Sequence, residues 1–303
     1  MALQLGNKLG YPTYSYKFVP AWNKKLRKLF VHDETAYKRA RRLAIPDDRL
    51  ELIGNLVADA VEHVAPAEPS GSPHILMMAG TRDGFSIFLI PFIIAVADYL
   101  KQSFPHASFV WPVSRLISEA TIRDGIAGLK KDILLGMDGV RDGNIITTPS
   151  GAVIQMIEEY ERHAHMRAAD LAITIPGTNT LELGIAGLPG IVILPMNKPE
   201  AIPLDGIGHW LGLIPFIGKH LKRYAVKAFV EGLDVPVSLP NRHTNEDLML
   251  ELKGKITAEQ VAKEAITLLN APEVLAQKRE RLLETMPKAG AAKRLVDSIS
   301  RDL

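Results

Sequence analysis

The chain has 303 residues, of which 47% are apolar and 23% are charged, proportions typical of a globular protein with an ample core. The formal net charge is only +2, so no overall field favours a nucleic acid as a partner. The absence of cysteine excludes disulfides, thiolate metal sites and a cysteine nucleophile, and it fits a reducing, cytoplasmic compartment.

The first 64 residues predict an incomplete α/β domain. Apolar runs and amphipathic periods indicate strands near residues 13–16, 29–31 and 50–53 and helices over 34–43 and 55–63. These elements amount to about half of a Rossmann-like sheet. Residues 65–73, APAEPSGSP, are rich in proline and serine and lack periodicity, which predicts a linker between two domains.

Residues 74–288 predict a larger domain, followed by a C-terminal helix within residues 289–303. The expected elements are strands near 75–78, 108–110, 171–175, 191–194 and 226 and late helices over 258–269 and 272–285. The apolar run 87–97 is shorter than the roughly 20 residues that span a bilayer, so it predicts a buried helix with Pro91 in its first turn. The dipeptide Asp142-Gly143 predicts a tight turn. Alternating strands and helices indicate a doubly wound parallel sheet.

The most informative segment of the larger domain is residues 171–196, which predicts a strand, a loop, a short helix and a second strand. Such a βαβ unit places the loop after its first strand at the carboxyl edge of the sheet, where ligands bind in open α/β folds. The backbone N–H groups of Gly177 to Thr180 then begin a helix, a position that favours a phosphate. Asn179 followed by Glu182 is equally compatible with a capping box, which needs no ligand.

Several segments of the chain resemble, in the same order, those of one enzyme family. Residues 177–182, GTNTLE, are similar to the SGTxTLE segment of the lipid-A-disaccharide synthase family, sugar-nucleotide glycosyltransferases of the GT-B fold. Residues 74–82, HILMMAGTR, resemble the family's strand that ends in LPGSR, and residues 104–113 resemble its YPxxxFVxPV. Residues 237–241, VSLPN, match a family run letter for letter. Upstream, residues 53–61 resemble the end of the family's N-terminal domain.

This resemblance implies a GT-B-like α/β protein. Its donor domain is a Rossmann-like, doubly wound parallel sheet over residues 74–288, and residues 1–64 form a partial, acceptor-side Rossmann-like domain. The implied reaction is inverting transfer of a sugar from a UDP-sugar of the UDP-GlcNAc type to a lipid-linked acceptor, without a metal or other cofactor. The family's acceptor loop and general base have no counterpart in residues 1–60, so no catalytic residue is assigned.

The resemblance also implies a set of residues that bind the donor. Arg82 and the loop amides would stabilise the charge on the departing UDP, Glu182 would accept hydrogen bonds from the ribose hydroxyls, and Asn241 would contact the nucleotide or the sugar. The full implied set is Arg82, Gly177, Thr178, Asn179, Thr180, Glu182 and Asn241. The simpler interpretations are a solvated arginine, a helix cap and a turn residue.

Residues 205–229 combine crowded apolar and aromatic residues with a basic cluster, a composition suited to an anchor on an anionic membrane. The expected membrane contacts are Trp210, Leu213, Phe216, Lys219, Lys222 and Arg223. The alternative is a buried helix flanked by a solvated basic face. With a lipid acceptor, the sequence predicts a cytoplasmic protein bound peripherally to the inner face of the membrane.

Other features of the sequence leave alternatives open. His163 and His165 lie two positions apart on a predicted helix and therefore point to different faces, so we interpret them as surface residues and not as a metal pair. The chain is compatible with another GT-B enzyme, either a glycolipid glycosyltransferase or a UDP-sugar epimerase. It is also compatible with a non-catalytic module that binds nucleotide sugars, and with a homo-oligomer.

Overall fold

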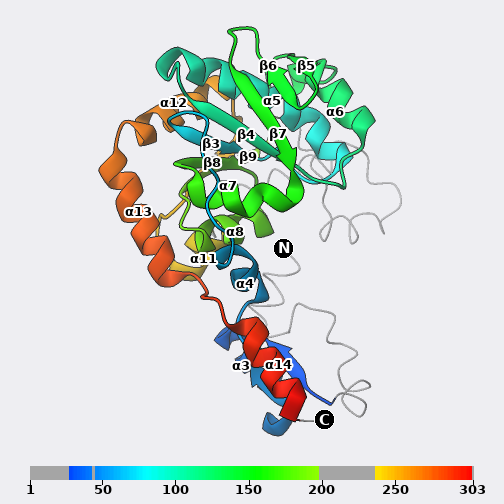
Figure 1. The fold of residues 1–303 in the computed structure, drawn as a ribbon, viewed down its shortest axis with the longest axis vertical. Helices are drawn as coiled ribbons and strands as arrows, with labels where there is room; N and C mark the ends of the chain where they lie inside the picture. The colour runs from blue at the N-terminus through cyan, green and yellow to red at the C-terminus, as the bar shows by residue number, and fades with distance from the viewer. Residues whose placement is uncertain (1–26, 43–44, 198–235, 302–303) are drawn as a thin grey trace. The chain divides into compact units, whose positions relative to one another are not determined.

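The computed structural model describes residues 27–42, 45–197 and 236–301 (Figure 1). The predicted strands near 13–16 and 226 lie outside the described residues, as do all six predicted membrane contacts. The chain forms two compact units. The described part of the first unit is residues 27–63, without 43–44, together with 287–301. The described part of the second unit is residues 64–197 and 236–286.

The second unit is built on a sheet whose described strands follow the order β10-β9-β8-β3-β4-β7-β6-β5. The strands are β3 (His74–Met77), β4 (Ser108–Val113), β5 (Val140–Asp142), β6 (Ile145–Thr147), β7 (Val153–Glu158), β8 (Leu171–Thr174), β9 (Gly190–Pro195) and β10 (Leu250–Gly254). All pairs from β10 to β7 are parallel, whereas β5 and β6 extend the sheet in antiparallel fashion.

The order of the six parallel strands confirms the predicted doubly wound sheet. From β3 the chain first adds β4 and β7 on one side, then crosses over and adds β8, β9 and β10 on the other. This is the strand order of a Rossmann fold, in which the direction of winding reverses beside the first strand. The point of reversal lies between β3 and β8, which pair directly.

Helices cover the sheet of the second unit (Figure 1). They are α5 (Asp83–Ser103), α6 (Glu119–Ile126), α7 (Arg162–Ala168), α8 (Thr178–Ile185), α11 (Leu239–Thr244), α12 (Ala258–Leu269) and α13 (Pro272–Thr285). Helix α5 packs between α6 and α12, and all three contribute to the main apolar core. Alternate strand residues such as Leu76 and Val110 are also buried, on the opposite face, where α7 and α8 contact β3 and β8.

Helix α5 differs from its predicted form. It begins at Asp83, so Pro91 lies in its interior and not in its first turn. Proline normally breaks a helix at such a position, but α5 is buried along most of its length, and this tertiary packing outweighs the local propensity. Among the described residues, α5 is also the one helix long and apolar enough to cross a membrane, and 72% of its apolar window is buried inside the protein. We therefore interpret it as the core helix.

The antiparallel extension was not predicted from the sequence, apart from its turn. Asp142 pairs with Ile145 across the predicted turn, so Asp142-Gly143 does end a strand of a hairpin. The strands β5 and β6 have three residues each, and β7 alternates between exposed and buried positions over much of its length. Short or half-exposed strands lack the continuous apolar run by which the buried strands were recognised.

The first unit contains two parallel strands and three helices among its described residues. They are β1 (Leu29–Val31), β2 (Leu50–Leu52), α3 (Glu34–Arg42), α4 (Leu56–Glu62) and α14 (Ala291–Arg301). The helix α14 packs against α4, although more than 200 residues separate them in the sequence. The carboxylate of Asp59 in α4 accepts hydrogen bonds from the backbone N–H groups of Gly290, Ala291 and Ala292, at 2.8, 3.0 and 3.2 Å. Asp59 thus caps α14 from another helix.

We predict that Asp59→Ala weakens this junction. Burial alone raises the pKa of Asp59, but the three backbone hydrogen bonds outweigh burial and lower the pKa. Loss of this cap should lower the free energy of unfolding of the unit by about 1 kcal/mol at neutral pH. Urea unfolding followed by circular dichroism measures the change. The exposed Asp48→Ala is the matched control, and equal stability of the two variants would contradict the capping role.

Candidate functional site

Two loops that the sequence singled out lie side by side at the point where the winding reverses. The loop from β3 to α5 carries Arg82, and the loop from β8 to α8 carries Gly177. The backbone N–H of Met78 donates to the carbonyl of Ile173 at 2.9 Å, which continues the pairing of the two strands to the base of the first loop. Since both strands are parallel, both loops emerge at the carboxyl edge of the sheet.

Arg82 and Gly177 are the residues from which the two helices begin. Each occupies the N-cap position, and each is exposed. Gly177 has φ of 151° and ψ of −168°, a backbone conformation that is essentially restricted to glycine. A Cβ atom built at Gly177 would meet no atom of the described residues within 4 Å, so the conformation and not crowding requires glycine. As far as the described residues go, the space beside this peptide is open.

The first turn of α8 connects the loop to the VSLPN segment. The hydroxyl of Thr180 donates to the carbonyl of Gly177 at 2.8 Å and accepts from the backbone N–H of Leu239 at 3.0 Å. The helices α8 and α11 approach closely at Gly184. A Cβ atom built there would lie only 2.8 Å from Cγ of Pro240. The structure therefore brings together two segments that lie about 60 residues apart, 177–182 and 237–241.

Glu182 does not form the capping box that its spacing from Asn179 suggested. The N-cap of α8 is Gly177, without a side-chain cap, and the carboxylate of Glu182 binds two residues of α7 instead. Arg162 donates from Nε to Oε2 at 2.8 Å and from Nη2 to Oε1 at 3.4 Å. His163 Nε2 lies 2.9 Å from the same Oε2. The alternative interpretation of Asn179 and Glu182 as a capping box is therefore wrong.

The two histidines of α7 were interpreted as surface residues, and the structure corrects this for His163, which is buried. His165 contacts His74, with 3.2 Å between its Nδ1 and Nε2 of His74. The two side chains therefore have separate partners, as their spacing predicts. Burial and the neighbouring His165 lower the pKa of His74 to about 4. No group of three or more potential metal ligands occurs in the part of the chain that the structure describes.

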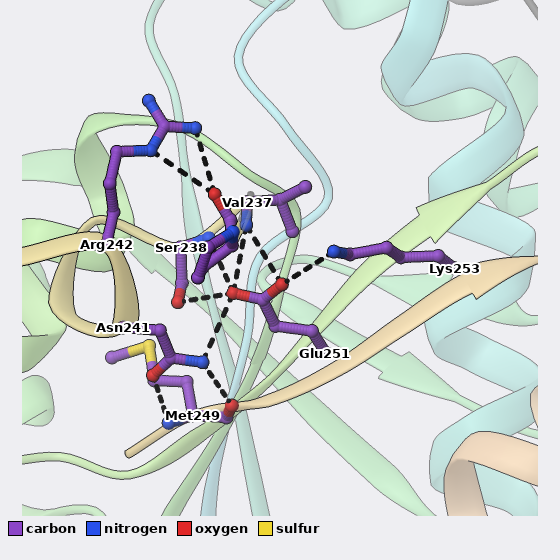
Figure 2. Close-up of polar contacts among 8 residues, drawn as sticks. Val237, Ser238, Asn241, Arg242, Met249, Glu251 and Lys253 are labelled. Atoms are coloured by element: carbon purple, nitrogen blue, oxygen red, sulfur yellow. Dashed lines mark hydrogen bonds and ion pairs between the residues drawn. The ribbon is translucent and has the colours of Figure 1, made fainter. Parts of the chain in front are cut away.

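The VSLPN segment is held by a carboxylate that the sequence analysis missed (Figure 2). Glu251 of β10 accepts hydrogen bonds from the backbone N–H groups of Val237 and Ser238, at 2.9 to 3.0 Å, and from the hydroxyl of Ser238 at 2.7 Å. Lys253 lies 3.2 Å from the same carboxylate. Burial alone raises the pKa of Glu251, but these hydrogen bonds outweigh burial and lower the pKa.

Asn241 belongs to the same network (Figure 2). Its amide nitrogen donates to the carbonyl of Met249 at 2.8 Å and to Glu251 at 3.2 Å, and its amide oxygen accepts from the N–H of Met249 at 2.8 Å. Asn241 is 2% exposed and lies on α11, not in a turn. Its contact with a nucleotide or sugar stays a prediction, and in this structure its side chain fixes α11 to the chain around Met249.

Described residues of the second unit line hollows at both edges of the sheet. One, of about 230 Å³, is at the carboxyl ends of β4 and β7, on the same edge as the two loops, and includes Ser114, Arg115 and Glu158 in its lining. A larger one, of about 610 Å³, lies at the other edge, where β4 begins and the β5–β6 hairpin turns. The smaller hollow shares the carboxyl edge of the sheet with the two loops, but none of the predicted donor-binding residues is among the described residues that line either hollow.

The strand order and the position of this site define the chain as an α/β protein with a GT-B type of fold. The S. aureus MnaA–UDP co-structure has a TM-score of 0.51 and 15% sequence identity, and the likeness covers 90% of this chain and 60% of that one. This likeness confirms the fold predicted from the sequence.

Curated relatives then give the particular resemblance. Lipid-A-disaccharide synthase from Syntrophus aciditrophicus is 24% identical over 223 residues, 73% of this chain and 47% of that protein. The protein of the same name from Geobacter sulfurreducens is 25% identical over 117 residues, 39% of this chain and 25% of that protein. No family model matches the sequence. The similarity confirms the predicted resemblance, and the matched part spans less than half the length of these two relatives.

We predict that Glu251→Ala loosens the VSLPN segment. The substitution leaves the N–H groups of the half-buried Val237 and the buried Ser238 without their acceptor, which should lower the free energy of unfolding by about 3 kcal/mol. Hydrogen exchange of these two amides should become about 100-fold faster. Lys253→Met is the control, because loss of the partly exposed ion pair should change stability by less than about 1 kcal/mol. Unchanged exchange at Val237 and Ser238 would show that Glu251 does not hold the segment.

We also predict an acid dependence of stability from Glu182. Burial alone raises the pKa of Glu182, but the hydrogen bonds from His163 and Arg162 outweigh burial, so the folded pKa lies below the usual 4.5. The contribution of Glu182 is therefore present above pH 4.5 and is lost as the pH falls through the folded pKa. In Glu182→Gln, the free energy of unfolding should depend less on pH between about pH 6 and about pH 3. Parallel profiles for wild type and variant in urea titrations would contradict this assignment.

Proposed function

We propose that the chain binds a UDP-sugar at the carboxyl edge of the larger sheet and takes part in transfer of the sugar to a lipid-linked acceptor. The observation that carries the proposal is the pair of neighbouring loops at the point of reversal. One places Arg82 and the other Gly177 at the start of a helix. The open space beside the backbone of Gly177 suits a group that approaches the peptide closely, as a diphosphate does.

The proposed chemistry requires that negative charge be stabilised on the departing UDP. At the start of α8 the backbone N–H of Thr180 donates to the carbonyl of Gly177 at 3.1 Å. The N–H groups of Thr178 and Asn179 would therefore bind the phosphate, and the helix dipole would add to their attraction. The guanidinium of Arg82 supplies a cation at the neighbouring helix. Glu182 would accept hydrogen bonds from the ribose hydroxyls. The proposal involves no metal or other cofactor.

In the proposed inverting transfer, an acceptor hydroxyl attacks the anomeric carbon of the sugar as the bond from that carbon to UDP breaks. The hydroxyl proton passes to a base, and no residue of this chain is assigned that role. The similarity to lipid-A-disaccharide synthases supports a lipid-linked acceptor. The apolar and basic composition of residues 205–229 supports peripheral binding to the cytoplasmic face of a membrane.

A UDP-sugar epimerase is the second candidate, because the fold alone, which is what the UDP-bound MnaA structure shares with this chain, does not decide the reaction. A module that binds the nucleotide sugar without transferring it is the third. Incubation with UDP-GlcNAc separates the three. An epimerase interconverts the sugar without a lipid, a transferase releases UDP only with an acceptor, and a binding module leaves the UDP-sugar unchanged.

We predict saturable binding of UDP and of UDP-GlcNAc in calorimetric titration of the purified chain. Glu182→Ala should weaken binding of both ligands by about tenfold or more, since a hydrogen bond to a charged group contributes on the order of 1.5 kcal/mol. Glu280→Ala, an exposed glutamate of α13, is the matched control and should bind like wild type. Absence of binding by a folded, monodisperse wild type would refute the proposed donor site.

A further inference from the structure

The carboxylate of Glu182 is bound asymmetrically. Oε2 accepts two short contacts, from Arg162 Nε at 2.8 Å and from His163 Nε2 at 2.9 Å. Among the described residues, Oε1 has one contact, a long one from Arg162 Nη2 at 3.4 Å. Since each carboxylate oxygen can accept two hydrogen bonds, Oε1 keeps most of its capacity, whereas Oε2 is fully used by α7.

The two donors are themselves held in place. Arg162 Nη1 donates to the carbonyl of Glu159, in the turn before α7, at 3.1 Å. The guanidinium of Arg162 therefore connects this turn with the carboxylate of Glu182 on α8. The side chains of Glu182 and His163 are each 11% exposed. Two donors fixed on one oxygen determine the rotation of the carboxylate group, and they thereby determine the direction in which the other oxygen points.

We infer that Arg162 and His163 are positioning residues, which bind Oε2 of Glu182 so that Oε1 accepts a hydrogen bond from a ribose hydroxyl of the nucleotide. The inference rests on the proposed UDP-sugar site and adds to it the residues that orient its ribose-binding group. Arg162 and His163 belong to the β7–α7 crossover, whereas Glu182 belongs to the β8–α8 crossover, so two neighbouring crossovers together build one acceptor.

A fixed acceptor distinguishes nucleotides with ribose hydroxyls from those without. A site built to hydrogen-bond a hydroxyl rejects an analogue that lacks it, because the polar group of the site is then left without its partner. We therefore expect wild type to bind UDP at least about tenfold more tightly than 2′,3′-dideoxy-UDP. The ratio of the two affinities reports on the ribose contact alone, because the diphosphate and the base are common to both ligands.

The test compares this ratio in variants of the two donors. His163→Leu and Arg162→Met should reduce the ratio to about one to three while binding dideoxy-UDP nearly as wild type does. His163→Gln should retain most of the discrimination, since the amide nitrogen of glutamine can donate from a similar place. His165→Gln is the matched control, because His165 lies on the same helix and contacts His74 instead of Glu182. Thermal unfolding of each variant establishes that it is folded.

Each outcome of the titrations decides the inference. Loss of discrimination in His163→Leu, with recovery in His163→Gln, supports it. Discrimination that persists in His163→Leu and Arg162→Met, or equal weakening of both ligands, overturns the positioning role and leaves the proposed function standing. Wild type that binds UDP without discrimination overturns the ribose contact of Glu182 and the inference with it. Wild type that binds neither nucleotide overturns both the inference and the proposed function.

Discussion

The direct pairing of β3 with β8 is the constraint from which the candidate site follows. Because the two strands are parallel neighbours on which the winding reverses, their following loops are adjacent and diverge into α5 and α8. In the described sheet, no other pair of neighbouring parallel strands has following connections that both lead away from the partner strand. An Arg82 loop and a Gly177 loop can therefore act on one ligand only at this position.

Two buried carboxylates support this edge of the sheet in different ways. Glu251 is surrounded by donors from its own chain, and its hydrogen bonds fix α11, which in turn contacts the first turn of α8 through Thr180. The side-chain amide of Asn241 forms hydrogen bonds within the same network. Contact with a nucleotide would require that one of these hydrogen bonds be broken. Glu182, in contrast, has one oxygen bound closely and the other only at 3.4 Å.

The sequence predicted the parallel strands β3, β4, β8 and β9, because strands buried on both faces, such as Leu171–Thr174, read as continuous apolar runs. It missed the parallel strand β7, which alternates between exposed and buried positions over much of its length. It also missed β10, the last of the described strands on its side of the sheet, where the charged residues Glu251 and Lys253 interrupt the apolar run, and it missed the start of α5 at Asp83. The predicted donor residues of the 177–182 and 237–241 segments do lie together. The contacts of Arg162 and His163 with Glu182 could not be predicted. They depend on the strand order, in which the chain passes from β7 across β4 and β3 before it forms β8.

The proposed ribose contact would explain why an ion pair is retained at Glu182. Transfer of a carboxylate and a guanidinium out of water is costly, and well-packed apolar residues of similar volume often stabilise a fold equally well. A buried ion pair is most useful where function requires a charged oxygen atom that is held in one direction. Glu182 lies in α8, the helix that follows the Gly177 loop, and Arg162 reaches it from α7. The proposed ribose contact would give this costly burial of charge a role in recognition of a polar ligand.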